Sequence, residues 1–136
     1  MALVIDSSAA IQIAMGSAEG LAMSGMIAKG EEVFAPDFLK LECANGFWRY
    51  VRARKLTAKQ ARELYQDSVS LATRFVRQND LVDEALHEAM RLDHPVYDVA
   101  YLVLARRLDA TLLSLDSRLV NLCIQEGVDC VEPVQL

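Results

Sequence analysis

Short apolar runs alternate along the chain with longer segments in which apolar residues recur at helical spacing. Residues 2–5 (ALVI) are apolar throughout, which is typical of a strand buried on both faces of a parallel sheet. Further strands are predicted at residues 32–35, 111–115 and 128–133, with a short one around 71–76 inside the otherwise helical segment 56–76. Helices are predicted over residues 9–15, 18–28, 36–52, 56–76, 80–93, 96–108 and 117–127.

The regular alternation of strand and helix predicts the fold class. It indicates an α/β sandwich of three layers, in which a mainly parallel central sheet is flanked by helices and the crossovers are right-handed. A length of 136 residues with 53% apolar residues suits a single domain, residues 1–136, with its own core. The sequence contains no linker, internal repeat or low-complexity segment.

Polar residues indicate where these helices begin and which faces are buried. Ser7 and Ser8 are expected to cap the first helix, and Thr57 the fourth. Pro36 and Asp37 are expected to open the third helix. Its core face is predicted to be the stripe Leu41, Ala44, Trp48 and Val51, with a polar stripe about 100° away formed by Glu42, Asn45, Arg49 and Arg52.

Charge and cysteine content narrow the function classes. A formal net charge of -5 argues against a surface that is basic throughout, but it allows local basic patches. Cys43, Cys123 and Cys130 have no metal-ligand spacing and are interpreted as core residues. Met1 is followed by no basic signal region, and no stretch is apolar enough to span a bilayer, so a cytoplasmic location without membrane contact is expected.

Four acids are expected at one edge of the predicted sheet. Asp6 and Asp116 directly follow strands, Asp98 lies in the first turn after Pro95, and Glu42 lies in the helix after the second strand. Each acid alone could be a helix cap or a surface charge. Together they would raise one another's pKa unless a cation compensated. Oxygen ligands without histidine or cysteine favour Mg²⁺, with Mn²⁺ as a substitute.

The segments that carry these acids resemble the PIN-domain family, and within it the VapC-type toxins of toxin–antitoxin pairs. The segment VIDSSA (4–9) resembles the family's first motif, and PDFLKLECANGFW (36–48) resembles the second. The most specific match is PVYDVAYLVLARRLDATLLSLDSRL (95–119). The resemblance covers nearly all 136 residues, but many relatives carry a further acid shortly after the fourth one, where this chain has Leu119.

The resemblance implies a PIN-like fold and a Mg²⁺-dependent endoribonuclease that hydrolyses RNA phosphodiesters with metal-activated water. It implies a homodimer and a cognate antitoxin whose C-terminal segment covers the acidic groove. The catalytic and metal-binding acids would be Asp6, Glu42, Asp98 and Asp116. Ser7, Asn45 and Ser114 would orient these carboxylates. Apart from the resemblance, Arg49 and Arg52 extend the polar stripe of Glu42, and they are expected either to bind the RNA phosphates or to form a solvated helix face.

Other interpretations of the same residues remain. A non-catalytic PIN-like module would bind RNA or a protein without cleaving it. A phosphoaspartyl phosphatase would need a second acid where Ser8 stands, and a response-regulator receiver would need an aspartate at the end of its third strand. Trp48, Tyr97 and Tyr101 are expected in the core or in a dimer interface rather than as base-stacking platforms.

Overall fold

A four-stranded parallel sheet forms the centre of the molecule. The computed structural model describes residues 2–27 and 31–131. The strands are β1 (Ala2–Ile5), β2 (Glu32–Pro36), β3 (Arg74–Val76) and β4 (Thr111–Leu113), in the order β3-β2-β1-β4. Leu3 pairs with Val33 on one side and with Thr111 on the other. The strand expected at 128–133 is reduced to one parallel bridge between Cys130 and Leu112, and residues 132 and 133 lie outside the described part.

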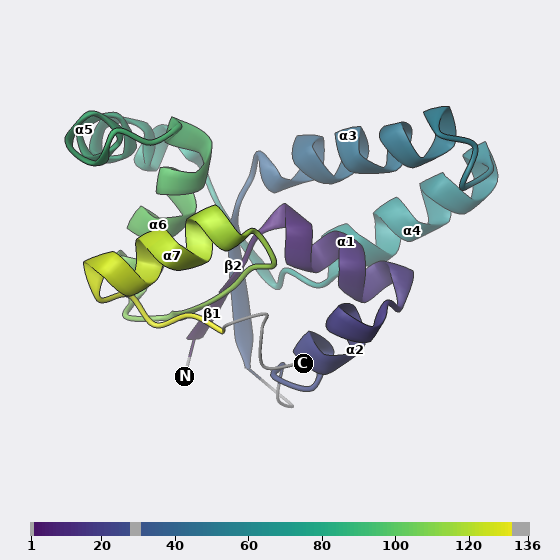
Figure 1. The fold of residues 1–136 in the computed structure, drawn as a ribbon, viewed down its shortest axis with the longest axis horizontal. Helices are drawn as coiled ribbons and strands as arrows, with labels where there is room; N and C mark the ends of the chain where they lie inside the picture. Colours follow the sequence, from purple (N-terminus) through teal and green to yellow (C-terminus); the bar gives the residue numbers. More distant parts are fainter. Residues whose placement is uncertain (1, 28–30, 132–136) are drawn as a thin grey trace.

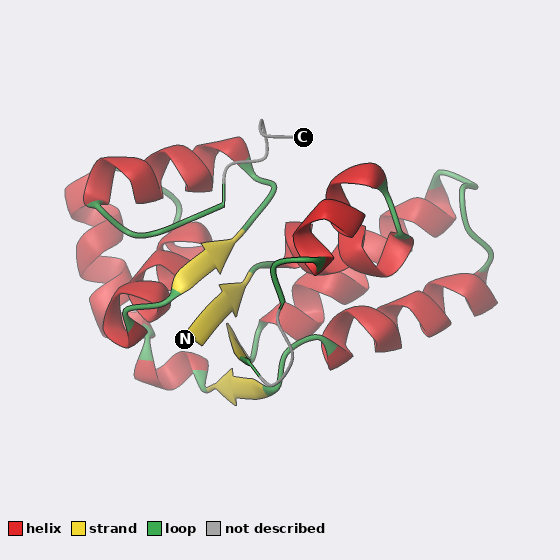
Figure 2. Cartoon of the chain, turned by 90° about the horizontal axis from the view of Figure 1, so that it is seen from below, coloured by secondary structure: helices red, strands yellow, loops and turns green. Residues whose placement is uncertain are grey.

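Helices cover both faces of this sheet, as Figures 1 and 2 show. One side carries α1 (Ser7–Met15), α2 (Ala18–Ser24), α3 (Leu39–Arg52) and α4 (Ala58–Ser70). The other side carries α5 (Val82–Leu92), α6 (Val96–Leu108) and α7 (Ser117–Glu126), preceded by a 3₁₀ turn at Gln78–Asp80. The predicted three-layer α/β sandwich with a parallel sheet is therefore confirmed, as is the short strand near residue 75.

The strand order places a topological switch point beside β1. The chain moves outward from β1 to β2 and β3, and then crosses to the opposite side of β1 to form β4. Open α/β sheets bind ligands outside the carboxyl ends of the strands at such a point. Asp6 follows the end of β1, and Ser114 and Asp116 follow the end of β4.

The core extends from the sheet into α6. All residues from Val99 to Ala105 are buried, because α6 packs between the sheet and the helices α5 and α7. Pro95 precedes this helix and Asp109, in the left-handed conformation, ends it. No helix in the described ranges is both long and apolar enough to cross a membrane.

Several predicted helix boundaries need correction. Asp6, and not Ser7 or Ser8, caps α1, because its carboxylate accepts the backbone N–H of Ala9 at 2.9 Å. Pro36 ends β2 instead of opening α3, which begins at Leu39 without a side-chain cap. The Thr57 cap is confirmed, with a reciprocal capping box to Gln60. The second helix ends at Ser24, and residues 28–30 near its predicted end lie outside the described part.

The predicted core face of α3 is wrong. The buried stripe is Leu39, Cys43 and Phe47. Leu41 is 76% exposed and Trp48 is 53% exposed. Both stripes recur at helical spacing, and packing of α3 against α1 and α4 selects the first one.

Candidate acidic site

Asp6 is the most buried acid of the site, with 4% of its surface exposed. Its Oδ1 accepts hydrogen bonds from the Ser8 hydroxyl at 2.7 Å and from the Ala9 N–H at 2.9 Å, and its Oδ2 accepts one from Ser114. Burial raises the pKa of Asp6 to about 6, although these hydrogen bonds lower it, and the nearby Glu42 raises it further. The carboxylate is thus held in one orientation at the end of β1.

Glu42 faces this position from the first turn of α3. The Tyr101 hydroxyl of α6 donates a hydrogen bond of 2.6 Å to Glu42 Oε1. Burial raises the pKa of Glu42, the Tyr101 hydroxyl lowers it, Asp98 raises it, and hydrogen bonding by Ser7 lowers it. Tyr101 is 2% exposed, so a core side chain holds the acid in place.

Asp98 and Asp116 complete the group from the other half of the molecule. Burial and the charge of Asp116 raise the pKa of Asp98, while His94 and Arg118 lower it. His94 Nδ1 lies 3.9 Å from Asp98 Oδ2, one turn earlier in the chain. Asp116 caps α7, and its Oδ1 accepts the Arg118 N–H at 3.0 Å.

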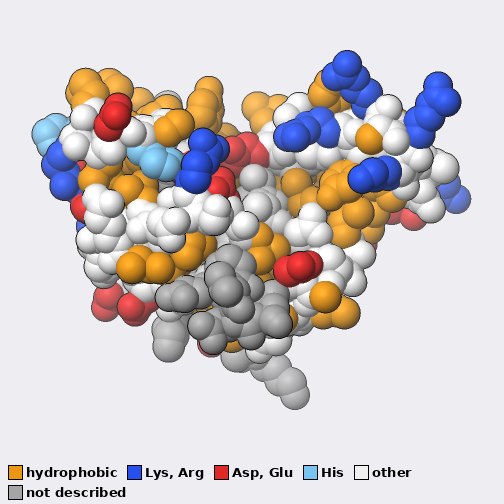
Figure 3. Space-filling model, in the orientation of Figure 1, with side chains coloured by type: hydrophobic (Ala, Val, Ile, Leu, Met, Phe, Trp, Pro, Cys, Tyr) orange, Lys and Arg blue, Asp and Glu red, His pale blue; other side chains and the backbone are white. Residues whose placement is uncertain are grey.

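The four acids form a series of neighbours. Asp6 lies beside Glu42, Glu42 beside Asp98, and Asp98 beside Asp116, as their effects on one another's pKa indicate. In Figure 3 acidic side chains lie at the bottom of the notch between the two halves of the molecule. Among the described residues, no three His, Cys, Asp or Glu side chains form a ready-made metal cage. The oxygen-only donors and their mutual repulsion suit Mg²⁺, which keeps several water ligands.

The other predicted site residues occupy different positions. Ser114 is fully buried, and its hydroxyl bonds Asp6 and accepts the Asp116 N–H at 3.0 Å. Asn45 is exposed on α3 and forms no hydrogen bond with the described residues. Leu119, where relatives carry a further acid, is buried in the core.

Three residues that contact or influence the acids were not predicted from the sequence. Ser8 bonds Asp6 and also accepts the Leu115 N–H at 2.8 Å, which ties the end of β1 to the end of β4. Its position two residues after Asp6 in the sequence could have indicated a hydrogen bond to that acid. Tyr101 stands three residues after Asp98 in a helix, and Arg118 stands two residues after Asp116, so both could have been noted.

Comparison with known proteins supports the fold. No family model matches the chain. Ribonuclease VapC3 from Pyrobaculum aerophilum is 25% identical over 123 residues, which are 89% of this chain and 94% of the relative. The crystal structure of PAE2754 from the same organism matches with a TM-score of 0.71 and 16% identity, over 99% of this chain and 94% of that one. VapBC2 from Rickettsia felis, bound to a DNA fragment from their promoter, matches with a TM-score of 0.66 and 11% identity, over 97% and 98%. The chain has the fold of a VapC-type PIN-domain protein.

In this VapC-type PIN-domain fold, basic side chains border the acidic site on one side. The α3–α4 hairpin projects from the sheet and carries cations at its far end (Figures 1 and 3). These cations are Arg49, Arg52, Arg54, Lys55, Lys59 and Arg62. None of them forms an ion pair with a described residue, although Arg52 lies over the Trp48 ring. By contrast, the arginines of α5 and α6 are all paired with carboxylates. Cations that lack protein partners are available for an external polyanion.

Proposed function

We propose that the protein is a Mg²⁺-dependent endoribonuclease and the toxin of a VapBC-type pair. The observation that carries this proposal is the group of four acids from four separate segments at the switch point of the sheet. The name of the relative VapC3, a ribonuclease, supports RNA as the substrate. The cations of the α3–α4 hairpin give a long anion a surface beside these acids.

Each residue has a defined task in this proposal. Asp6, Glu42, Asp98 and Asp116 would hold the ion, which when bound supplies an activated water and neutralises charge on the phosphate. Ser8 and Ser114 fix the orientation of Asp6, and Tyr101 fixes that of Glu42. Arg49 and Arg52 bind phosphates of the RNA strand outside the acidic group.

A partner of the antitoxin kind would block the same acids. The structure of VapBC2 from Rickettsia felis, which has the same fold, supports an antitoxin partner for this chain. We propose that the partner places a basic side chain among the four carboxylates, because a guanidinium neutralises them with bidentate hydrogen bonds. A complex in which the partner binds elsewhere and leaves these acids open would contradict this proposal.

The alternative is a PIN-like module that binds RNA or a protein without cleaving RNA. Buried hydroxyl groups that orient two carboxylates favour catalysis, since binding alone does not require fixed acids. The two functions differ in one simple result, because only the enzyme produces new RNA ends.

A cleavage assay with purified protein tests the proposal. We expect total RNA to be cut in Mg²⁺ and to stay intact in EDTA. Asp98→Asn should slow cleavage by at least about 100-fold, because metal-ion catalysis contributes several kcal/mol to the rate. Asp83→Asn is the matched control, since Asp83 is an exposed carboxylate in the first turn of α5 and is not one of the four acids. Unchanged cleavage in EDTA would exclude the metal, and RNA binding without cleavage would support the module.

A further inference from the structure

A cavity of about 510 Å³ opens between α1 and α3 beside the acidic site. Ser8 and Leu115 line it, and Ser8 is the residue that bonds Asp6. The cavity therefore shares a wall with the carboxylates but contains none of them. Its volume lies within the range of about 300–1,000 Å³ that small-molecule sites occupy.

Two of the unpaired cations line this cavity. Arg49 and Lys55 border it, and neither side chain forms an ion pair or a hydrogen bond with any residue in the described ranges. Along α3, Arg49 stands about 10 Å beyond Glu42, at 1.5 Å per residue. A phosphate next to the acidic group would thus be within reach of a guanidinium and an ammonium.

A second pair of polar groups is fixed inside the same cavity. The Gln12 side-chain N–H donates to the Tyr50 hydroxyl oxygen at 3.2 Å, and the Tyr50 ring lies 6.3 Å from the Phe47 ring. The side-chain amide oxygen of Gln12, Oε1, and the hydroxyl hydrogen of Tyr50 have no partner among the described residues. One acceptor and one donor are thereby presented side by side, which is the pattern that recognises the edge of an unpaired base.

The remaining wall of the cavity is apolar. Ile11 and Ala53 line it, together with Gly46. A Cβ at position 46 would stand 2.4 Å from Ile11 Cδ1, so glycine allows α1 to approach α3 closely. The walls are thus suited to the faces of a flat ring, with polar groups at its edge.

We propose that this cavity holds one nucleotide of a single-stranded RNA, adjacent to the phosphodiester that is cut. Arg49 and Lys55 bind its phosphate, and Gln12 and Tyr50 read its base. The proposal rests on the proposed ribonuclease function, because it assigns the substrate position beside the acidic group. It makes Gln12 and Tyr50 residues that determine which base stands next to the cut.

Binding of mononucleotides tests the cavity without any cleavage. AMP, GMP, CMP and UMP are titrated in EDTA into the full chain and followed by amide chemical shifts, with inorganic phosphate and the unphosphorylated nucleosides as further probes. We expect the four nucleotides to differ in affinity and all to bind more tightly than phosphate. Tyr50→Phe and Gln12→Ala should each weaken binding of the preferred nucleotide about threefold to tenfold, which is the loss of one hydrogen bond.

Matched variants separate the two parts of the cavity. Arg49→Ala should weaken nucleotide binding about tenfold while leaving nucleoside binding unchanged, because it removes a charged phosphate contact. Tyr65→Phe on α4 and Arg77→Ala near β3 lie outside the cavity and should bind as the parent does. The proposal would be overturned if inorganic phosphate bound as tightly as the nucleotides. It would also be overturned if the parent bound all four nucleotides with equal affinity and Tyr50→Phe bound them as tightly as the parent.

Mapping of cut sites distinguishes this proposal from the function on which it rests. If RNA is cut, Gln12→Ala and Tyr50→Phe should broaden the base preference beside the cut more than they lower the total rate. Cutting with an unchanged base preference in both variants would refute the nucleotide cavity and leave the ribonuclease intact. Nucleotide binding without any RNA cleavage would support the cavity and refute the ribonuclease. A partner protein that occupies the cavity while no nucleotide does would refute the nucleotide assignment.

Discussion

Hydroxyl groups orient two of the acids in the site by hydrogen bonding. Asp6 is surrounded by the hydroxyls of Ser8 and Ser114, and Glu42 by that of Tyr101. Burial opposes the charged form of both acids, while these donors favour it. Asp6 also caps α1, so the same carboxylate caps the start of this helix and belongs to the acidic group. The orientation of these two carboxylates is therefore fixed by hydroxyl groups of the protein itself.

The substitution Asp98→Asn tests whether the acids repel one another. In EDTA we expect the melting temperature to stay equal or rise, because one like charge leaves the group while the side-chain shape is kept. Added Mg²⁺ should stabilise the parent by binding to the folded state, and should stabilise the variant much less. Thermal melts of both proteins with and without Mg²⁺ give the comparison.

A control separates this effect from the helix dipole. Asp83, like Asp98, lies in the first turn of a helix, but it is exposed on α5. Asp83→Asn should lower stability slightly in EDTA and leave the Mg²⁺ shift unchanged. Equal Mg²⁺ shifts for the parent and Asp98→Asn, or a clear loss of stability in EDTA, would remove Asp98 from the site.

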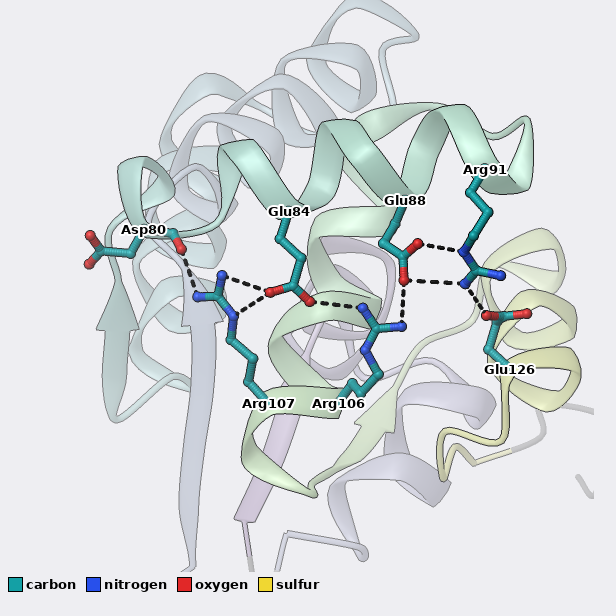
Figure 4. A network of polar contacts seen from close by, with 7 residues as sticks. All are labelled: Asp80, Glu84, Glu88, Arg91, Arg106, Arg107 and Glu126. Atoms are coloured by element: carbon teal, nitrogen blue, oxygen red, sulfur yellow. Dashed lines mark hydrogen bonds and ion pairs between the residues drawn. The ribbon is translucent and has the colours of Figure 1, made fainter.

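At the scale of elements, ion pairs connect α5 with α6 and α7. Figure 4 shows that α5 and α6 face each other through alternating acids and arginines, and that Arg91 reaches Glu126 of α7. Glu88 receives Arg91 Nε at 2.6 Å and Arg106 at 2.7 Å, and Glu84 receives Arg106 and Arg107. Hydrogen bonds from Arg91 and Arg106 lower the pKa of Glu88 to about 2.

This network predicts a loss of stability in acid. The pKa of Glu88 in the folded state lies below its ordinary value of 4.5, so its ionised form stabilises the fold above that pH. The contribution is lost as the pH falls from 4.5 towards about 2. Glu88→Gln should therefore unfold at lower urea concentration than the parent at neutral pH, and the difference should shrink below about pH 4. Glu63→Gln, exposed on α4, is the control, and a difference that does not change with pH would contradict the assignment.

Helix α3 shows where sequence reasoning stops. The alternation of elements and the turn residues predicted a parallel sheet and most helices, because they depend on local pattern. The helix carries two apolar stripes, and only the tertiary contacts decide that Leu39, Cys43 and Phe47 are buried. The acids were predicted because each follows a strand or opens a helix. The hydrogen bonds from Tyr101 to Glu42 and from the Leu115 N–H to Ser8 join residues far apart in sequence, so spacing could mark Tyr101 and Ser8 as candidates but could not predict these partners.

At the scale of the whole molecule, the charges are unevenly distributed. The arginines of α5 and α6 are bound in ion pairs, whereas the cations of the α3–α4 hairpin form none with the residues that the structure describes. A chain with a net charge of -5 can therefore present a basic surface next to an acidic site. Leu41, which was predicted for the core, is instead part of an exposed apolar surface.

That apolar surface extends over three helices of the molecule. Its residues are Leu41 of α3, Val82, Leu86 and Met90 of α5, and Tyr97 of α6, and each is about half exposed or more. Leu41, Val82 and Tyr97 surround one hollow of about 390 Å³. Contiguous exposed apolar patches of this kind mark association sites. We propose that a second copy of the chain covers it, as the family resemblance implies, with the ion-pair network holding α5 rigid beneath.

The double substitution Leu86→Lys with Met90→Lys tests this dimer. The parent should sediment with twice the chain mass of 15.1 kDa, because a standard interface needs only about 800 Å² from each copy. The variant should keep the circular dichroism spectrum of the parent, because both side chains are exposed. It should sediment as a monomer, because two lysines of one copy would face two lysines of the other across a two-fold axis. Ile124→Lys is the control: Ile124 is 53% exposed on α7, outside the surface, and its variant should keep the parent's mass. A parent that is monomeric at every concentration, or a double variant that keeps the dimer mass, would place the association site elsewhere or exclude it.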